Sequence, residues 1–151
     1  MLLARVNINT GRFHNDIIHN MLNISIKTIE DQKQRYDTVG DYFTDKSGKT
    51  QILISDMNDS RYEFLIAMHE LVESMLCKER GVTDVKIDQF DFEYENNRSK
   101  GDSESIPGDQ LDCPYYKEHQ FATKIEKLLA EELNVDWNTY NNACAKLTET
   151  N

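Results

Sequence analysis

Long apolar runs, positive charge and cysteine are all scarce in this sequence. No stretch approaches the roughly 20 apolar residues that a membrane-spanning helix needs, so no membrane segment is expected. The first seven residues become polar too soon for a signal peptide, which makes the cytoplasm the expected location. The three cysteines lie far apart and form no CxxC pair, which favours reduced thiols over a disulfide framework.

The shortage of positive charge argues against nucleic acid as a partner. The chain has 17 Lys and Arg against 27 Asp and Glu, a formal net charge of −10. A surface of this kind repels phosphate backbones, and no Lys/Arg cluster offsets the repulsion. A Gly-rich phosphate loop, a dinucleotide fingerprint and a GxSxG elbow are also missing. The sequence therefore favours a peptide or a protein over nucleic acid as partner or substrate.

What is present favours a single domain, residues 1–151, of mixed α+β class. Residues 36–43 and 51–57 are expected to pair as a β-hairpin, and a further short strand is expected at 5–9. The stretch 84–113 is acidic and polar, and a loop is expected at Asn96–Ser105. The spacing of apolar residues predicts helices over 15–34, 60–80 and 114–133 and after Asp136. Three to four helices would then pack on a small antiparallel sheet.

The predicted helix over residues 60–80 carries the clearest local signals. Ser60 and Glu63 fit a capping box at its start. Gly81 stands where a helix end requires a residue free of Cβ strain. A wide apolar stripe lies between these two signals, so this helix is expected to form the centre of the protein.

That helix also carries the run His69-Glu70-Leu71-Val72-Glu73. His69 and Glu73 are four residues apart, so both side chains project from one face and can bind one cation. Glu70 lies between them, as the general base does in the HExxH helix of zinc proteases. Zinc accepts carboxylate oxygen, and two His with one Glu is a well-attested set of ligands. The run predicts a zinc site, or a site for a related divalent transition metal, with Glu70 as the catalytic group.

A third ligand must come from elsewhere in the chain. Of the remaining histidines, His119 is the best candidate because it stands near the start of the third predicted helix. Glu126 shares a helix face with it, and Asp109 and Asp112 lie just upstream. These three carboxylates are expected either as further ligands or as groups that orient a histidine.

A structural explanation of the same run stays open. His69 could be an ordinary hydrogen-bonded residue, with Glu70 and Glu73 on a solvated edge of the helix. Polar side chains within an apolar helix are unfavourable unless they have partners, which favours the metal site.

Several segments together carry a further pattern: Tyr36–Phe43, Ile54–Met57, His69–Glu73, Pro107–Asp109, Glu118–Ala122 and Leu133–Trp137. They resemble a family of small phage and prophage proteins of unassigned function, over about residues 5–140. The order of a hairpin followed by an HExx helix is also similar to the minimal zincin core of metallopeptidases. That resemblance implies His69 as a ligand, Glu70 as general base, and residues 51–57 as an edge strand that pairs with an extended peptide. The chain departs from zincins at Glu73, where they have histidine.

Three functions follow as expectations. The first is a metal-dependent hydrolase of minimal zincin type, acting on a peptide or another amide. The second is a phage-encoded protein-binding module that retains a zincin-like core without catalysis, with or without a structural metal. A fourth protein ligand, from Asp109 or Glu126, would indicate the second function. The third is a metal-free helical adaptor in which His69 is simply packed.

Overall fold

The computed structural model describes residues 22–98 and 105–148. The described part has the α+β architecture expected from the sequence. It contains the strands β1 (Ile24–Ile29), β2 (Gly40–Thr44) and β3 (Thr50–Ser55), and the helices α1 (Ser60–Arg80), α2 (Asp84–Asn97), α3 (Tyr116–Glu132) and α4 (Trp137–Thr148). The expected strand at 5–9, together with His14 and His19, lies outside the described residues.

The three strands form one mixed sheet in the order β1-β3-β2. β2 and β3 are antiparallel, as the predicted hairpin requires, with Gly40 opposite Ile54. β1 runs parallel to β3 on its other side, with Ile24 opposite Thr50. The expectation of a simple antiparallel sheet was therefore wrong. The expectation that residues 51–57 form an edge strand was also wrong, because β3 has a hydrogen-bonded neighbour on each side.

The strand β1 replaces the second half of the helix predicted over residues 15–34. Its β-branched side chains Ile24, Ile26, Thr28 and Ile29 favour a pleated, half-buried environment over a helix. The parallel pairing with β3 supplies the backbone hydrogen bonds that a helix would otherwise make internally. Residues 15–21 of that predicted helix lie outside the described part.

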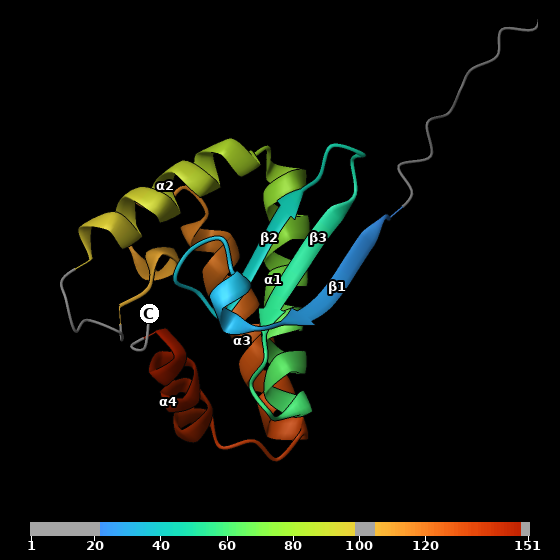
Figure 1. Cartoon of the computed structure of the whole chain (residues 1–151), viewed down its shortest axis with the longest axis vertical. Coiled ribbons are helices and arrows are strands. Elements are labelled where there is room, and N and C mark those ends of the chain that lie inside the picture. Colours follow the sequence, from blue (N-terminus) through green and yellow to red (C-terminus); the bar gives the residue numbers. More distant parts are fainter. Residues whose placement is uncertain (1–21, 99–104, 149–151) are drawn as a thin grey trace, which may run out of the picture.

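Helix α1 lies against one face of the sheet and packs on its other side against α3 (Figure 1). It begins one residue earlier than the capping box implied, because Asp59 rather than Ser60 is the N-cap and accepts a hydrogen bond from the Arg61 amide at 2.9 Å. Glu63 instead accepts from the amide of Met57. Gly81 ends the helix at φ 73°, the left-handed conformation expected of it.

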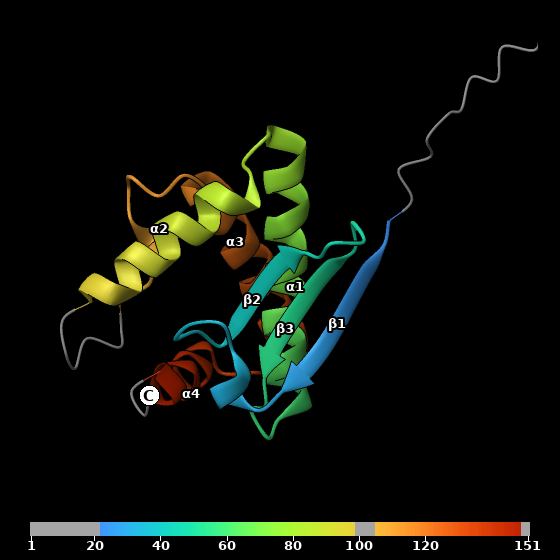
Figure 2. The same cartoon turned by 45° about the horizontal axis from the view of Figure 1, so that its top comes forward.

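Helix α2 is an element that the sequence analysis did not expect. Only Ile87 and Asp91 are buried along it, so its apolar stripe is too thin to recognise in the sequence. Figure 2 shows α2 and α4 on the same side of the α1–α3 pair, next to β2 and the loop before it. These elements form the walls around the site described below.

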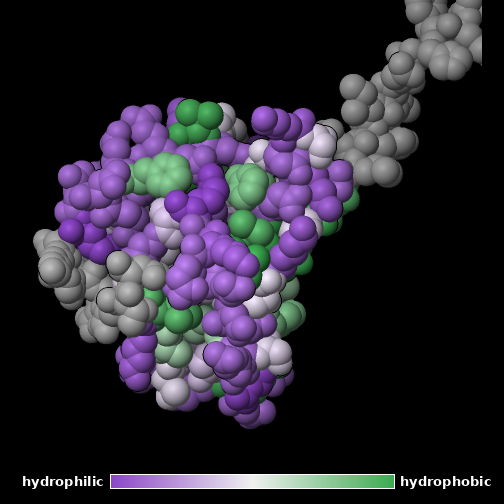
Figure 3. Space-filling model, in the orientation of Figure 1, coloured by the Kyte–Doolittle hydropathy of each residue, from purple (hydrophilic) through white to green (hydrophobic). Residues whose placement is uncertain are grey.

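The hydrophobic core lies between the sheet and α1, where Ile52, Ile54 and Leu65 are almost fully buried. The surface seen in Figure 3 is mostly hydrophilic, with apolar side chains in small separate groups. Within the described ranges, no helix combines the length and the apolar character needed to cross a membrane.

Candidate metal centre

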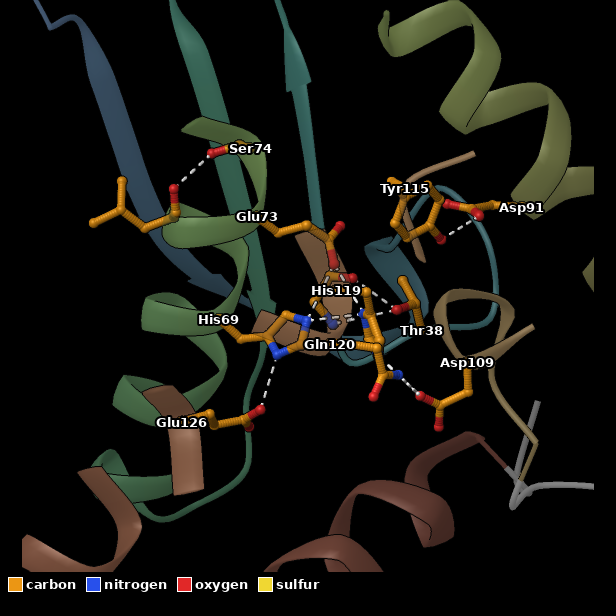
Figure 4. A network of polar contacts seen from close by, with 12 residues as sticks. Thr38, His69, Glu73, Ser74, Asp91, Asp109, Tyr115, His119, Gln120 and Glu126 are labelled. Carbon is orange, nitrogen blue, oxygen red and sulfur yellow. Dashed lines mark hydrogen bonds and ion pairs between the residues drawn. The ribbon is translucent and has the colours of Figure 1, made fainter. Parts of the chain in front are cut away.

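Three buried side chains meet where α1 packs against α3. His69 and Glu73 project from α1, and His119 projects from α3 toward them (Figure 4). The Nε2 atom of His69 lies 3.3 Å from Glu73 Oε2 and 3.1 Å from His119 Nδ1, and the last two atoms are 2.9 Å apart. One atom of each residue therefore points to a common position, and the group could bind a metal ion.

The spacing of these atoms fits a small tetrahedral ion. A zinc ion with bonds of about 2.0–2.1 Å places its ligand atoms about 3.3 Å apart. The three separations of 2.9–3.3 Å are close to that value, so the donors match three corners of a tetrahedron with little movement. Two imidazole nitrogens and one carboxylate oxygen are also a donor set that zinc accepts.

The other ring nitrogen of His69 is held by Glu126. His69 Nδ1 donates to Glu126 Oε2 at 2.8 Å, and the hydroxyl of Tyr140 on α4 donates to Glu126 Oε1. In the neutral form of His69 that binds a metal, a proton held on Nδ1 leaves the lone pair of Nε2 facing Glu73 and His119. Glu126 thus orients a candidate ligand, which is one of the two roles expected for it.

Asp109 lies near the outer ring nitrogen of His119, as Glu126 does for His69. Its Oδ1 atom lies 3.6 Å from His119 Nε2, a long contact, and accepts a hydrogen bond from Gln120 at 2.7 Å. Gly108 lets the backbone approach this histidine, because a Cβ there would come within 2.4 Å of the His119 ring. Asp112, by contrast, is exposed and does not line the site.

Glu70 lies one residue beyond His69 and faces β2. A Cβ on Gly40 would come within 2.5 Å of Ile66 Cγ2 and 2.6 Å of Glu70 Oε1, so glycine at residue 40 lets the strand pass close to this carboxyl. Burial, and then the negative charge of Glu73, raise the pKa of Glu70 well above its usual value. A raised pKa means a higher proton affinity, which is the property that a general base needs.

The candidate ligands carry opposite charges: His69 is favoured in its protonated form and Glu73 in its deprotonated form. Burial opposes the charged form of His69, but the carboxylates of Glu126 and Glu73 outweigh this effect and raise the pKa of His69 well above its usual value. Burial would raise the pKa of Glu73, but hydrogen bonds from His119 and His69 lower it to about 2. The metal-free group is therefore a buried ion-paired cluster.

The group borders a cavity of about 620 Å³ whose walls come from α1–α4, β2 and the loops before β2 and α3. On the α2 side, Asp91 accepts hydrogen bonds from Tyr115 at 2.5 Å and from Tyr36 at 3.2 Å. Burial raises the pKa of Asp91 to about 7. Aromatic side chains and carboxyl groups thus share the lining of the cavity.

The edge strand β2 borders the same cavity, and side chains already cover much of its free edge. In an antiparallel pair, the backbone N–H and C=O groups of alternate residues point toward and away from the partner strand. The hydrogen bonds Ser55 N to Val39 O and Asp45 N to Lys49 O show that Gly40, Tyr42 and Thr44 point these groups away from β3. Three side-chain contacts use these groups: Thr38 Oγ1 to Gly40 O at 2.7 Å, Arg35 Nη2 to Tyr42 O at 3.4 Å, and Thr44 N to Asp84 Oδ2 at 2.7 Å. Little of this edge is left for an added strand.

Sequence reasoning did not anticipate Tyr140 or the two close approaches at Gly40 and Gly108. Both glycines stand in segments that carry the family resemblance, but nothing local indicated which side chains they would meet. Tyr140 follows the apolar spacing of a short helix and gave no sign of a polar partner. Comparisons with models of protein families, with curated proteins and with solved structures find no match for this chain.

Proposed function

We propose that this protein is a zinc-dependent hydrolase that cleaves an amide bond in a peptide or another compact substrate. The convergence of His69, Glu73 and His119 on one position is the observation that carries the proposal. Among the described residues, Glu126 and Asp109 lie on the outer ring nitrogens rather than at that position. Three protein donors with an open fourth position are typical of catalytic zinc sites, whereas structural sites have four.

In this proposal Glu70 is the general base and acid. Zinc, when bound, lowers the pKa of water and polarises a carbonyl group. Glu70 takes a proton from the attacking water and passes it to the departing nitrogen. Its raised pKa supports the first step, because a carboxylate of higher proton affinity accepts a proton from water more readily. Gly40 leaves the space that this carboxyl occupies beside β2.

The covered edge of β2 argues against an extended peptide as the substrate. The resemblance to zincins implied an extended peptide paired with an edge strand, but side chains of Thr38, Arg35 and Asp84 occupy the outward backbone groups of β2. Strand addition would require these contacts to break. A compact amide or the end of a peptide chain, entering the cavity beside the metal, meets no such obstacle.

The same covered edge favours a second candidate, the non-catalytic binding module. In that case the metal would act structurally by joining α1 to α3 through His69, Glu73 and His119. The similarity to small phage proteins is compatible with either candidate and remains a prediction.

The test begins with metal content. The protein, purified without a His-tag or chelator, is expected to hold about one equivalent of zinc by plasma mass spectrometry, and His69→Ala is expected to lose it. Glu70→Gln should keep the metal and lose turnover of short amide substrates by about 100-fold or more. Glu79→Gln is the matched control, because Glu79 is exposed near the end of the same helix.

Each outcome separates the candidates. Metal retained in Glu70→Gln with unchanged turnover would reject the role of Glu70. Metal in the wild type without turnover of any amide tested would support the structural candidate. A protein that takes up no metal even after added zinc would reject the hydrolase and the structural metal, and would leave the binding module without metal or the metal-free adaptor.

A further inference from the structure

We propose that Tyr140 is a positioning residue of the metal centre, which acts through Glu126 on the imidazole of His69. This makes the C-terminal helix α4 part of the metal site, although α4 supplies no ligand. The inference rests on the proposed function, since it requires a metal at His69.

The contacts form a continuous chain from α4 to the metal position. The Tyr140 hydroxyl donates to Glu126 Oε1, and Glu126 Oε2 accepts from His69 Nδ1 at 2.8 Å. All three side chains are buried, with exposed fractions of 2%, 7% and 9%. In the described part of the chain, Tyr140 and His69 are the two hydrogen-bond partners of Glu126.

This arrangement restricts the rotation of the carboxylate. A glutamate side chain turns about three bonds, so one hydrogen bond to His69 leaves the plane of the carboxylate free to swing. A second hydrogen bond, to the opposite oxygen, fixes that plane and keeps Oε2 on Nδ1 of His69. The proton then stays on Nδ1, and Nε2 keeps its lone pair directed at the metal position.

The ring of Tyr140 is held independently of its hydroxyl. It makes edge contacts with Tyr62 on α1, at 5.2 Å between ring centroids, and with Trp137 on α4, at 5.4 Å. Tyr140→Phe should therefore keep the packing of α4 and remove the hydrogen bond to Glu126, together with the contact between the hydroxyl and Cys144 on the same helix. Tyr62→Phe is the matched control: it removes a hydroxyl from the same ring contact, and that hydroxyl has no partner among the described residues.

Zinc affinity is measured by competition with a chromophoric chelator for the full-length wild type and both variants. Tyr140→Phe is expected to bind zinc about tenfold more weakly, at the lower end of effects seen when a group that orients a ligand is removed. Tyr62→Phe is expected to stay within about twofold. Nitrogen-15 NMR of histidine should show a slowly exchanging Nδ1 proton on His69 in the zinc-loaded wild type, and faster exchange in Tyr140→Phe.

A double-mutant cycle separates positioning from a general structural effect. If Tyr140 acts through Glu126, then Tyr140→Phe should produce no further loss of affinity in a Glu126→Ala background. Additive losses would overturn the inference, as would equal zinc affinity and an equal Nδ1 proton signal in Tyr140→Phe and wild type. A wild type that binds no zinc would overturn the proposed function itself, which is a different result from an unaffected Tyr140→Phe.

Discussion

The Nε2 atom of His69 lies 3.1 Å from the Nδ1 atom of His119. Two imidazole nitrogens can face each other at this distance when one donates a proton to the other or when a cation lies between them. Glu73 Oε2 is close to both nitrogens and accepts whatever proton they share. In the metal-free protein, a proton thus occupies the region in which a metal would be bound.

Metal binding is therefore expected to release a proton. The raised pKa of His69 means that the metal-free protein carries this proton at neutral pH. Since a metal binds neutral imidazole, the apparent affinity should rise about tenfold per pH unit, as long as the pH is below that pKa. Calorimetry in buffers of different ionisation enthalpy should show about one proton released per metal. A pH-independent affinity, with no release of protons, would contradict this account.

Gly108→Ala should weaken metal binding by displacing His119. The new Cβ would come within 2.4 Å of the ring, and the ring must move away from its shared position with His69 and Glu73. Metal affinity measured by chelator competition is expected to fall by tenfold or more.

Gly48→Ala provides the matched control for that variant. Gly48 has φ 82° and nothing within 4 Å of a Cβ, so alanine there strains the backbone far from the site. It should lower the free energy of unfolding by about 1 kcal/mol and leave the metal affinity unchanged. Equal affinities of the two glycine variants would show that the approach to His119 is not required.

Asp91 should make the metal-free protein less stable as the pH rises. Burial raises its pKa in the folded protein to about 7, above the ordinary value of 3.8. The folded state then holds the proton more tightly than the unfolded state. The stability that this gives is complete below about pH 4 and is lost as the pH rises toward 7, with a slope of up to about 1.4 kcal/mol per pH unit.

The slope is measured by chemical denaturation between pH 4 and 8 in the presence of a chelator. Asp91→Asn removes the titrating group but keeps an oxygen that can accept the hydrogen bond from Tyr115. The variant should lose this part of the pH dependence. The same slope in the variant and the wild type would show that other groups are responsible.

Local signals in the sequence were enough to predict the positions of most of the helices and of the hairpin. The ends of α1 were expected within one residue, because an N-cap side chain and Gly81 act on neighbouring backbone groups. The start of α4 after Asp136 was predicted correctly, and Asp136 caps α4 through the amide of Thr139 at 2.8 Å, whereas α3 starts two residues later than predicted. Helical spacing failed at Ile24–Ile29, because pairing with a strand that lies far along the chain overrides local preference.

The sequence by itself determined the chemistry of the candidate site: the helical spacing of His69, Glu70 and Glu73 needs only one element, and His119 was the best of few histidines. The tertiary structure decided everything that depends on distant segments meeting. It placed Glu126 and Asp109 behind the histidines, brought Tyr140 to Glu126, and put β3 in the centre of the sheet. The physical reason is that helical periodicity and capping are interactions within a few residues, whereas strand order and contacts between helices arise only when the chain packs.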